Sequence, residues 1–343
     1  FHKTQVLKDA VIQSAKILEV DGNTDEIKSL IDSAMQAGVE RNLGHDYLVD
    51  IDARYEESAR VTSPTPWDII NELMQGGLGG GELGVVVAPA GIGKSWVLSA
   101  MGAYGLSQGL NVVHYTLELN EAYVGLRYDS IFSGVESQNL KYHKEEVMEK
   151  LFNLKGNLTI KYYPTKACTV NTLSAHLKKV TTFGKKVDMV LVDYADIMRD
   201  VHKSQEMRHA LGNIYEDLRG LAGELQVPIW TASQANRSAL DEDVIEATKV
   251  AESYAKVMTA DFVMSLSRKI EDKIGNTGRF HVIKNRFGPD GLTYPARINT
   301  NIGKIEIFES GSVQGKNVQH KINNRDNQVK EMLSARYEDL MNE

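Results

Sequence analysis

The stretch Ala88-Pro89-Ala90-Gly91-Ile92-Gly93-Lys94-Ser95 is the feature that most constrains this chain. It follows the apolar run 83–87 and precedes a helical-looking segment at 96–108, so a strand, a glycine-rich loop and a helix come in the order of a phosphate-binding P-loop. Small residues let backbone N–H groups turn around a polyphosphate, and the new helix adds its free N–H groups and positive dipole end. Ala88 stands where the strict pattern has glycine, which still leaves a small side chain.

The loop predicts which residues surround the phosphates. Lys94 is expected to reach the β- and γ-phosphates, and the Ser95 hydroxyl is expected to occupy one position around Mg²⁺. The other expected nucleotide-binding residues are Ala90, Gly91, Ile92, Gly93 and Trp96.

Composition sets wide limits on the class of protein. The 343 residues leave room for one large α/β domain with appendages or for two domains, and 42% hydrophobic residues can fill a sizeable core. The single cysteine, Cys168, argues against a disulfide framework or a cysteine metal cluster, and fits a reducing cytosol. No run approaches the roughly 18 apolar residues of a membrane helix, and no secretion signal opens the sequence. A net charge of −7 does not indicate nucleic-acid binding, although a basic strip on one face would suffice for it.

Alternating strands and helices predict a mainly parallel, doubly wound sheet. Expected strands are 83–87, 111–117, 158–162, 185–193, 227–232, 262–267, 280–284 and 292–307, the last with a break near 300–301. Expected helices are 66–74, 96–108, 121–133, 144–153, 173–180, 206–225 and 329–340. Two further helices, at 1–20 and from residue 25, cannot form a core alone. They are expected to pack on a preceding domain, on a neighbouring subunit or on the main domain.

Three polar residues follow predicted strands, and ligands of open α/β sheets bind at the carboxyl ends of the strands. Asp193 is expected to hold Mg²⁺, the alternative being an ordinary surface carboxylate. Glu118 is placed to orient and deprotonate a water beside the γ-phosphate, or it only complements a helix dipole. Gln234 is placed to sense the γ-phosphate, or it simply closes its strand.

Lys284 and Arg286 lie on a predicted β-hairpin. An arginine that a neighbouring subunit brings to the γ-phosphate stabilises the transition state, whereas two basic residues on a hairpin are otherwise usually just solvated. No cluster of His, Cys, Asp or Glu has the sequence spacing of a metal site. His114 and His176 are expected to be structural.

With these motifs in order, residues 46–308 resemble the hexameric replicative DNA helicases of the DnaB and T-even phage type, which have a RecA-like ATPase core. The resemblance rests on Gly-Gly-Leu at 76–78, Thr-Leu-Glu-Leu at 116–119, Val-Asp-Tyr at 192–194, Ser-Gln at 233–234 and Lys-Asn-Arg-Phe-Gly-Pro at 284–289. It implies Glu118 as catalytic base, Asp193 as the Mg²⁺ acid and Gln234 as the sensor that couples the γ-phosphate to DNA. Arg286 resembles the arginine finger that acts in trans, with Lys284 beside it.

The resemblance also implies that DNA is bound by loops facing a central channel, which match 200–208 and about 241–254. Lys203, Arg208 and Lys249 are the candidate DNA contacts. In the second loop, Ala251 stands where many relatives have arginine and Tyr254 where they have glycine.

The expected domains are a helical linker or N-terminal-domain tail at 1–45, a RecA-like ATPase domain at 46–309 and a polar tail with a helix at 310–343. The expected function is an ATP- and Mg²⁺-dependent replicative helicase that moves on single-stranded DNA as a homo-hexameric ring. Expected partners are a primase and a helicase loader, in a bacterial or phage-infected cytoplasm, without a membrane. Two alternatives are a RecA-type recombination ATPase that forms filaments and a non-catalytic, nucleotide-switched DNA-binding or loader protein.

Overall fold

The computed structural model describes residues 2–19, 27, 31, 46–52, 55, 60–250 and 254–324. The chain divides into two compact units, Phe1–Ala59 and Arg60–Glu343. The first unit contains the predicted first helix, α1 (His2–Glu19). Of the helix predicted from residue 25, only residues 27 and 31 are described, both helical, and the helix predicted at 329–340 lies outside the described residues. The three-domain division stays a prediction.

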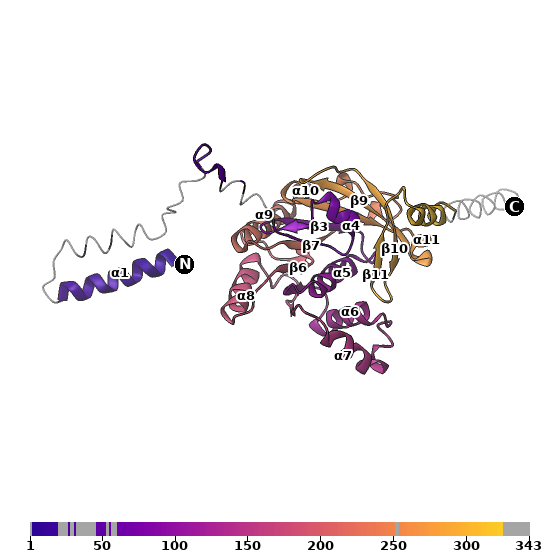
Figure 1. Ribbon diagram of the computed structural model, residues 1–343. Coiled ribbons are helices and arrows are strands. Elements are labelled where there is room, and N and C mark those ends of the chain that lie inside the picture. Colours follow the sequence, from indigo (N-terminus) through magenta and orange to yellow (C-terminus); the bar gives the residue numbers. More distant parts are fainter. Residues whose placement is uncertain are drawn as a thin grey trace. The chain divides into compact units, whose positions relative to one another are not determined.

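The second unit is built on one nine-stranded sheet in the order β11-β10-β9-β8-β3-β7-β6-β4-β5 (Figure 1). Six strands are parallel: β3 (Leu83–Ala88), β4 (Val112–Thr116), β5 (Leu158–Tyr162), β6 (Met189–Asp193), β7 (Ile229–Gln234) and β8 (Phe262–Ser267). The remaining three are antiparallel: β9 (Thr277–Asn285), β10 (Thr293–Asn299) and β11 (Lys304–Ile307). A mainly parallel sheet is therefore confirmed.

Helices cover both faces of this sheet, as a doubly wound fold requires (Figure 1). One face packs against α4 (Asp68–Leu73), α5 (Lys94–Ser107) and α6 (Glu121–Ser133). The other packs against α8 (Val170–Thr182), α9 (Met207–Leu225) and α10 (Ala255–Thr259). The small elements are β1 (Thr62–Ser63), β2 (Leu78–Gly79), α7 (Lys144–Phe152), α11 (Ile270–Gly275) and a helix at 313–324. No helix among the described residues has the length and hydropathy to span a membrane.

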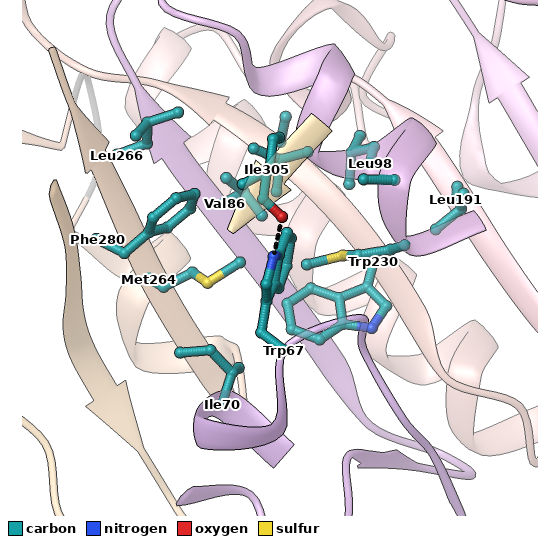
Figure 2. Packing of buried hydrophobic residues seen from close by; sticks show 14 of the residues in the cluster. Trp67, Ile70, Val86, Leu98, Leu191, Trp230, Met264, Leu266, Phe280 and Ile305 are labelled. Carbon is teal, nitrogen blue, oxygen red and sulfur yellow. Dashed lines mark hydrogen bonds between the residues drawn. The ribbon is translucent and has the colours of Figure 1, made fainter. Parts of the chain in front are cut away.

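Two buried tryptophans anchor the first face (Figure 2). The Trp67 indole N–H donates to the Ile305 carbonyl at 3.0 Å, and its ring lies 5.8 Å from that of Phe280. This bond satisfies the buried indole N–H of Trp67 and fixes α4 against the last strand of the sheet. Trp230 lies on β7 over Gly84 of β3, the residue directly opposite it.

Several boundaries differ from the sequence prediction for local reasons. The first helix of this unit begins at Asp68 rather than at Pro66, with Trp67 as N-cap. The Thr65 backbone N–H and hydroxyl both donate to the Asn71 side chain, at 2.7 and 2.8 Å, and the hydroxyl accepts the Trp67 N–H at 3.3 Å, so Thr65 holds the turn that precedes the helix. The six-residue helix α11 was not predicted, because a helix of this length carries too little periodicity to be recognised, and the helix described at 313–324 was not predicted either.

Gly84 provides a test of this packing. A Cβ at Gly84 would lie 2.4 Å from the Trp230 ring, so Gly84→Ala should overpack the core and lower the free energy of unfolding by about 1–3 kcal/mol. Gly220→Ala on α9 is the matched control, because its Cβ meets nothing within 4 Å, and it should be neutral or stabilising by up to about 1 kcal/mol. Urea unfolding followed by circular dichroism measures both. Equal effects of the two substitutions would contradict the packing described here.

Candidate active site

The carboxyl ends of β3, β4, β6 and β7 surround a cavity of about 380 Å³. Its lining includes most of the residues that the sequence assigned to the nucleotide: Ala90, Gly91, Gly93, Lys94, Ser95, Trp96, Glu118 and Gln234. Ile92 does not line the cavity, because its side chain is buried in the core and only its backbone belongs to the loop. Asp193 lies at the end of β6 without lining the cavity, and Lys284 and Arg286 do not line it either. Residues far apart in the chain thus meet at one edge of the sheet, where parallel α/β proteins bind their ligands.

The P-loop backbone has the conformation that its glycines allow. Gly91 and Gly93 have φ values of 71° and 121°, in the region that L side chains rarely adopt. Gly93 is the N-cap of α5, and no side chain caps the first turn of that helix. The N–H groups at the start of α5 therefore remain available to an anion in the cavity.

Asp193 is the last residue of β6 and is only 1% exposed. Its carboxylate accepts a hydrogen bond from the Ser95 side chain, while Oδ1 is buried without a hydrogen-bond partner in the described chain. Burial raises the pKa of this carboxyl, against the Ser95 hydrogen bond and the Arg127 charge. A desolvated carboxylate oxygen next to a P-loop hydroxyl is a suitable donor for a hard cation such as Mg²⁺.

Lys94 extends along the loop and donates from Nζ to the Pro89 carbonyl at 3.3 Å. The Tyr194 ring lies 5.5 Å from Nζ. Burial lowers the pKa of Lys94, whereas the carboxylates of Asp193, Glu118 and Asp196 raise it. The Lys94 ammonium is therefore stabilised by the negative charges of three carboxylates, and the negative charge of a bound polyphosphate would stabilise it further.

Main-chain hydrogen bonds between neighbouring strands hold Glu118 and Gln234 at the cavity. Glu118 is exposed and follows Leu117, whose N–H donates to the Asp193 carbonyl at 2.8 Å. Gln234 ends β7 opposite Ala88, the last residue of the P-loop strand. Both side chains thus sit beside the loop, one on each side of β6 and its Asp193.

Arg127, on α6, also lines the cavity and was not identified from the sequence. Its guanidinium lies 5.2 Å from the Trp96 ring, and Nη1 is buried without a hydrogen-bond partner among the described residues. Burial lowers its pKa, and Asp193 and Glu118 raise it. A signal was present, because Arg127 lies between Val124 and Tyr128 on the buried face of its helix.

Lys284 and Arg286 lie at the other end of the strands, near the amino end of the P-loop strand, and do not line this cavity. Asn285 pairs with Phe262, which pairs with Gly84, so the end of β9 is level with the start of the P-loop strand. The end of that strand is four residues further, or about 13 Å at the usual strand rise. Arg286 instead pairs with Asp261 at 2.8 Å, and Lys284 donates to the Val257 and Met258 carbonyls at 2.9 and 2.5 Å.

The three candidate DNA contacts lie on different elements: Lys203 on the first predicted loop, Arg208 on the first turn of α9 and Lys249 in the second predicted loop. Lys203 and Arg208 are exposed, and Lys249 forms an ion pair with Glu242 at 2.8 Å. A groove of about 820 Å³ is lined by Arg208 from the start of α9 and by Thr248, Val250 and Tyr254 from the second loop, whereas Lys203 and Lys249 do not line it. Residues 251–253 lie outside the described residues.

One acidic cluster was not visible in the sequence, since its members are spread over two elements. Ligand atoms of Asp200, His202 and Asp217 lie within 4.8 Å of one another. The Asp200 carboxylate accepts the backbone N–H groups of His202 and Ser204 at 3.0 and 2.9 Å, so it holds the first loop in shape. Exposed acidic groups commonly lie this close without any ion.

The two histidines expected to be structural have buried or half-buried positions and phenol partners. His114 Nδ1 lies 2.8 Å from the Tyr128 hydroxyl, and burial lowers the pKa of His114 to about 3, which keeps it neutral. His176 Nδ1 lies 2.9 Å from the Tyr115 hydroxyl. Neither histidine lines the cavity.

Comparison with known proteins gives a consistent result. Residues 64–302 match the family model described as the DnaB-like helicase C terminal domain. The DnaB-like replicative helicase of Enterobacteria phage T4 is 26% identical over 305 residues, covering 80% of this chain and 64% of the phage protein. The replicative DNA helicase DnaB of Geobacillus stearothermophilus is 26% identical over 251 residues, covering 66% of this chain and 55% of the bacterial protein. The chain thus spans less than two thirds of the length of these relatives.

Two solved structures share the fold. One, described as an ATPase domain, superposes with a TM-score of 0.65 at 17% identity, over 76% of this chain and 97% of that one. A DnaB-like replicative helicase, solved in a study of its interactions with primase, gives 0.67 at 17% identity, over 88% of this chain and 76% of that one. These similarities confirm the RecA-like fold. Together with the family match over most of its second unit, they show that this chain belongs to the family of the DnaB-like helicase C-terminal domain.

Proposed function

We propose that this chain is an ATP-dependent replicative DNA helicase that acts as a hexameric ring on single-stranded DNA, with ATP hydrolysed between subunits. The observation that carries the proposal is the separation of two halves of one site. Lys94, Ser95, Glu118 and Asp193 gather at the carboxyl edge of the sheet, whereas Arg286 lies at the amino edge. An arginine finger in that position is out of reach of its own P-loop and available to the P-loop of another subunit.

In this proposal, ATP binds with its phosphates against the loop backbone, the start of α5 and Lys94. Ser95 and Asp193 would hold Mg²⁺, because the Asp193 carboxylate is desolvated, next to the hydroxyl and without a partner for Oδ1 among the described residues. When bound, the ion neutralises charge on the β- and γ-phosphate oxygens. Trp96, Ala90, Gly91 and Gly93 line the cavity and would enclose the phosphates.

Hydrolysis requires a base beside the γ-phosphate. Glu118 would orient a water and take its proton while the water oxygen bonds to the γ-phosphorus. The bond from that phosphorus to the bridging oxygen breaks, and ADP leaves with the electron pair. Lys94 and Arg127 of the same subunit and Arg286 of the next one would stabilise the charge that develops on the phosphoryl oxygens.

Arg286 has to leave its ion-pair partner, Asp261, to reach the nucleotide of a neighbouring subunit. In the single chain Arg286 is bound to Asp261, which Arg219 also contacts at 3.0 Å. Arg219 therefore keeps Asp261 paired when Arg286 turns to a neighbour's phosphate. Lys284 would stay on the carbonyls of α10 and hold the hairpin in place.

DNA binding is assigned to the two predicted loops, together with the groove between α9 and the second loop. Lys203 and Arg208 are exposed cations that can contact phosphates, whereas Lys249 must first leave Glu242. Contacts of this kind track the backbone without reading sequence. Gln234 would report the presence of the γ-phosphate to the second loop, which follows β7 in the chain.

The partners follow from the relatives. The solved DnaB-like helicase is described with its interactions with primase, and we extend this to a primase and a helicase loader for this chain. The expected setting is a bacterial or phage-infected cytoplasm, since the named relatives are replicative helicases of bacteria and a phage.

A subunit-mixing experiment tests the shared site. Arg286→Ala and Lys94→Ala should each reduce DNA-stimulated ATPase activity by about 10³-fold or more when all subunits carry the change. Mixing the two variants creates interfaces with an intact Lys94 and an intact Arg286, so part of the activity should return. Activity is measured across mixing ratios, with electron microscopy on DNA to confirm closed rings. No recovery at any ratio, or helical filaments in place of rings, would overturn the proposal.

Arg127 is expected to act in the site of its own subunit. Arg127→Met should lower the ATPase rate by about 10²-fold, because it removes one preorganised cation from the phosphates. Mixing with Lys94→Ala should give no recovery, since both losses fall in the same half-site. Arg297→Met is the control, because Arg297 pairs with Glu306 at 3.3 Å and does not line the cavity. An Arg127→Met rate within about twofold of the control would exclude this role.

A further inference from the structure

We propose that the buried ion pair between Asp196 and Lys256 is the link through which Gln234 moves the second DNA-binding loop. The inference deepens the proposed function and rests on it. Asp196 and Lys256 are positioning residues here, since neither of them lines the nucleotide cavity.

The Asp196 carboxylate is a point of convergence for groups from three elements. Oδ1 lies 2.9 Å from Lys256 Nζ and accepts from the Tyr215 hydroxyl at 2.8 Å. Oδ2 accepts from the Gln234 backbone N–H at 2.9 Å and from the Ser233 hydroxyl at 3.1 Å. The end of β7, where Gln234 lies, is therefore held through this one carboxylate.

Lys256 is 1% exposed, on the short helix α10. Its ammonium donates to Ser233 Oγ at 3.2 Å and lies 5.6 Å from the Tyr215 ring. A buried ammonium is strongly unfavourable without a carboxylate, so Lys256 cannot leave Asp196 without finding another anion. A helix of five residues has little stability of its own, and this pair fixes where α10 lies.

The segment that contains the second loop begins and ends at the same carboxylate. Gln234 immediately precedes residues 235–254, and Lys256 follows them on α10. Between these ends, Ala235 forms an antiparallel bridge with Val250, and the Asn236 N–H donates to the Lys249 carbonyl at 2.9 Å. A displacement of Gln234 toward or away from a γ-phosphate would thus pull on both ends of the loop through Asp196.

Asp196 acts electrostatically on the nucleotide cavity and, through α10, lies near Lys284. It closely follows Asp193 in the chain, and its charge is one of the three that raise the pKa of Lys94. The residues that follow Lys256 on α10, Val257 and Met258, accept hydrogen bonds from Lys284 through their carbonyls. The ion pair therefore lies between the cavity and α10, whose carbonyls hold the hairpin that contains Lys284 and Arg286.

A binding measurement separates this role from ordinary structural support. The affinity for a fluorescent single-stranded oligonucleotide is measured by anisotropy with and without a non-hydrolysable ATP analogue, and the ratio of the two affinities reports coupling. In the unmodified chain the analogue should change DNA affinity by about tenfold or more. In Lys256→Met the ratio should fall toward one, because Gln234 and the loop are no longer joined.

Lys249→Met is the matched control, because it makes the same substitution within the loop, whereas Lys256 lies on α10 after it. It removes a candidate DNA contact, so it should weaken DNA binding with and without the analogue while the ratio is kept. Asp196→Asn combined with Lys256→Met leaves no unpaired buried charge, and it serves if Lys256→Met alone does not fold. Lys256→Arg keeps a cation beside Asp196 and should restore part of the ratio.

The outcomes separate a failure of the proposed function from a failure of the link through Asp196 and Lys256. If the analogue leaves DNA affinity unchanged in the folded, unmodified chain, the proposed function itself fails. If the unmodified chain shows coupling and both Lys256→Met and the double variant keep the full ratio, only the link through Asp196 and Lys256 is overturned. A ratio that collapses in these variants and persists in Lys249→Met supports the link.

Discussion

The direction of β9 is the constraint on which the rest of the site depends. Six strands run parallel and bring their carboxyl ends to the P-loop edge, but β9 runs antiparallel to β8 and carries its last residues to the other edge. The acids and the loop are thereby separated from Arg286 within one chain. In the proposed function, this separation leaves Arg286 to act at the P-loop of a second subunit.

The sequence predicted the elements whose signals are local, and the strand ends at which the candidate site residues lie. β5, α6 and β8 have the predicted bounds, since each is a short apolar or periodic run between clear breaks. Glu118, Asp193 and Gln234 lie at the ends of such runs. Their convergence could be inferred because the carboxyl ends of parallel strands share one edge.

The interactions that could not be predicted join residues far apart in the sequence. Arg127 lies on the buried face of its helix, but its place beside the cavity depends on Trp96 and on the acids of neighbouring strands. Lys256 and Asp196 lie on different elements, and their pairing depends on where α10 packs. The pair of Lys249 with Glu242 is more local, yet its geometry depends on a loop without periodicity. Patterns specify faces and ends of elements, whereas charge pairing requires the tertiary arrangement.

ATP-dependent unwinding of a forked DNA duplex tests the central claim most directly. The chain should separate the strands with ATP and Mg²⁺, and single-stranded DNA should increase its rate of ATP hydrolysis. Glu118→Gln should still bind nucleotide and DNA but should neither hydrolyse ATP nor unwind the fork, because only the base is lost. A folded, ring-forming chain that binds both ligands without turnover, or a Glu118→Gln variant that unwinds at the unmodified rate, would contradict the account.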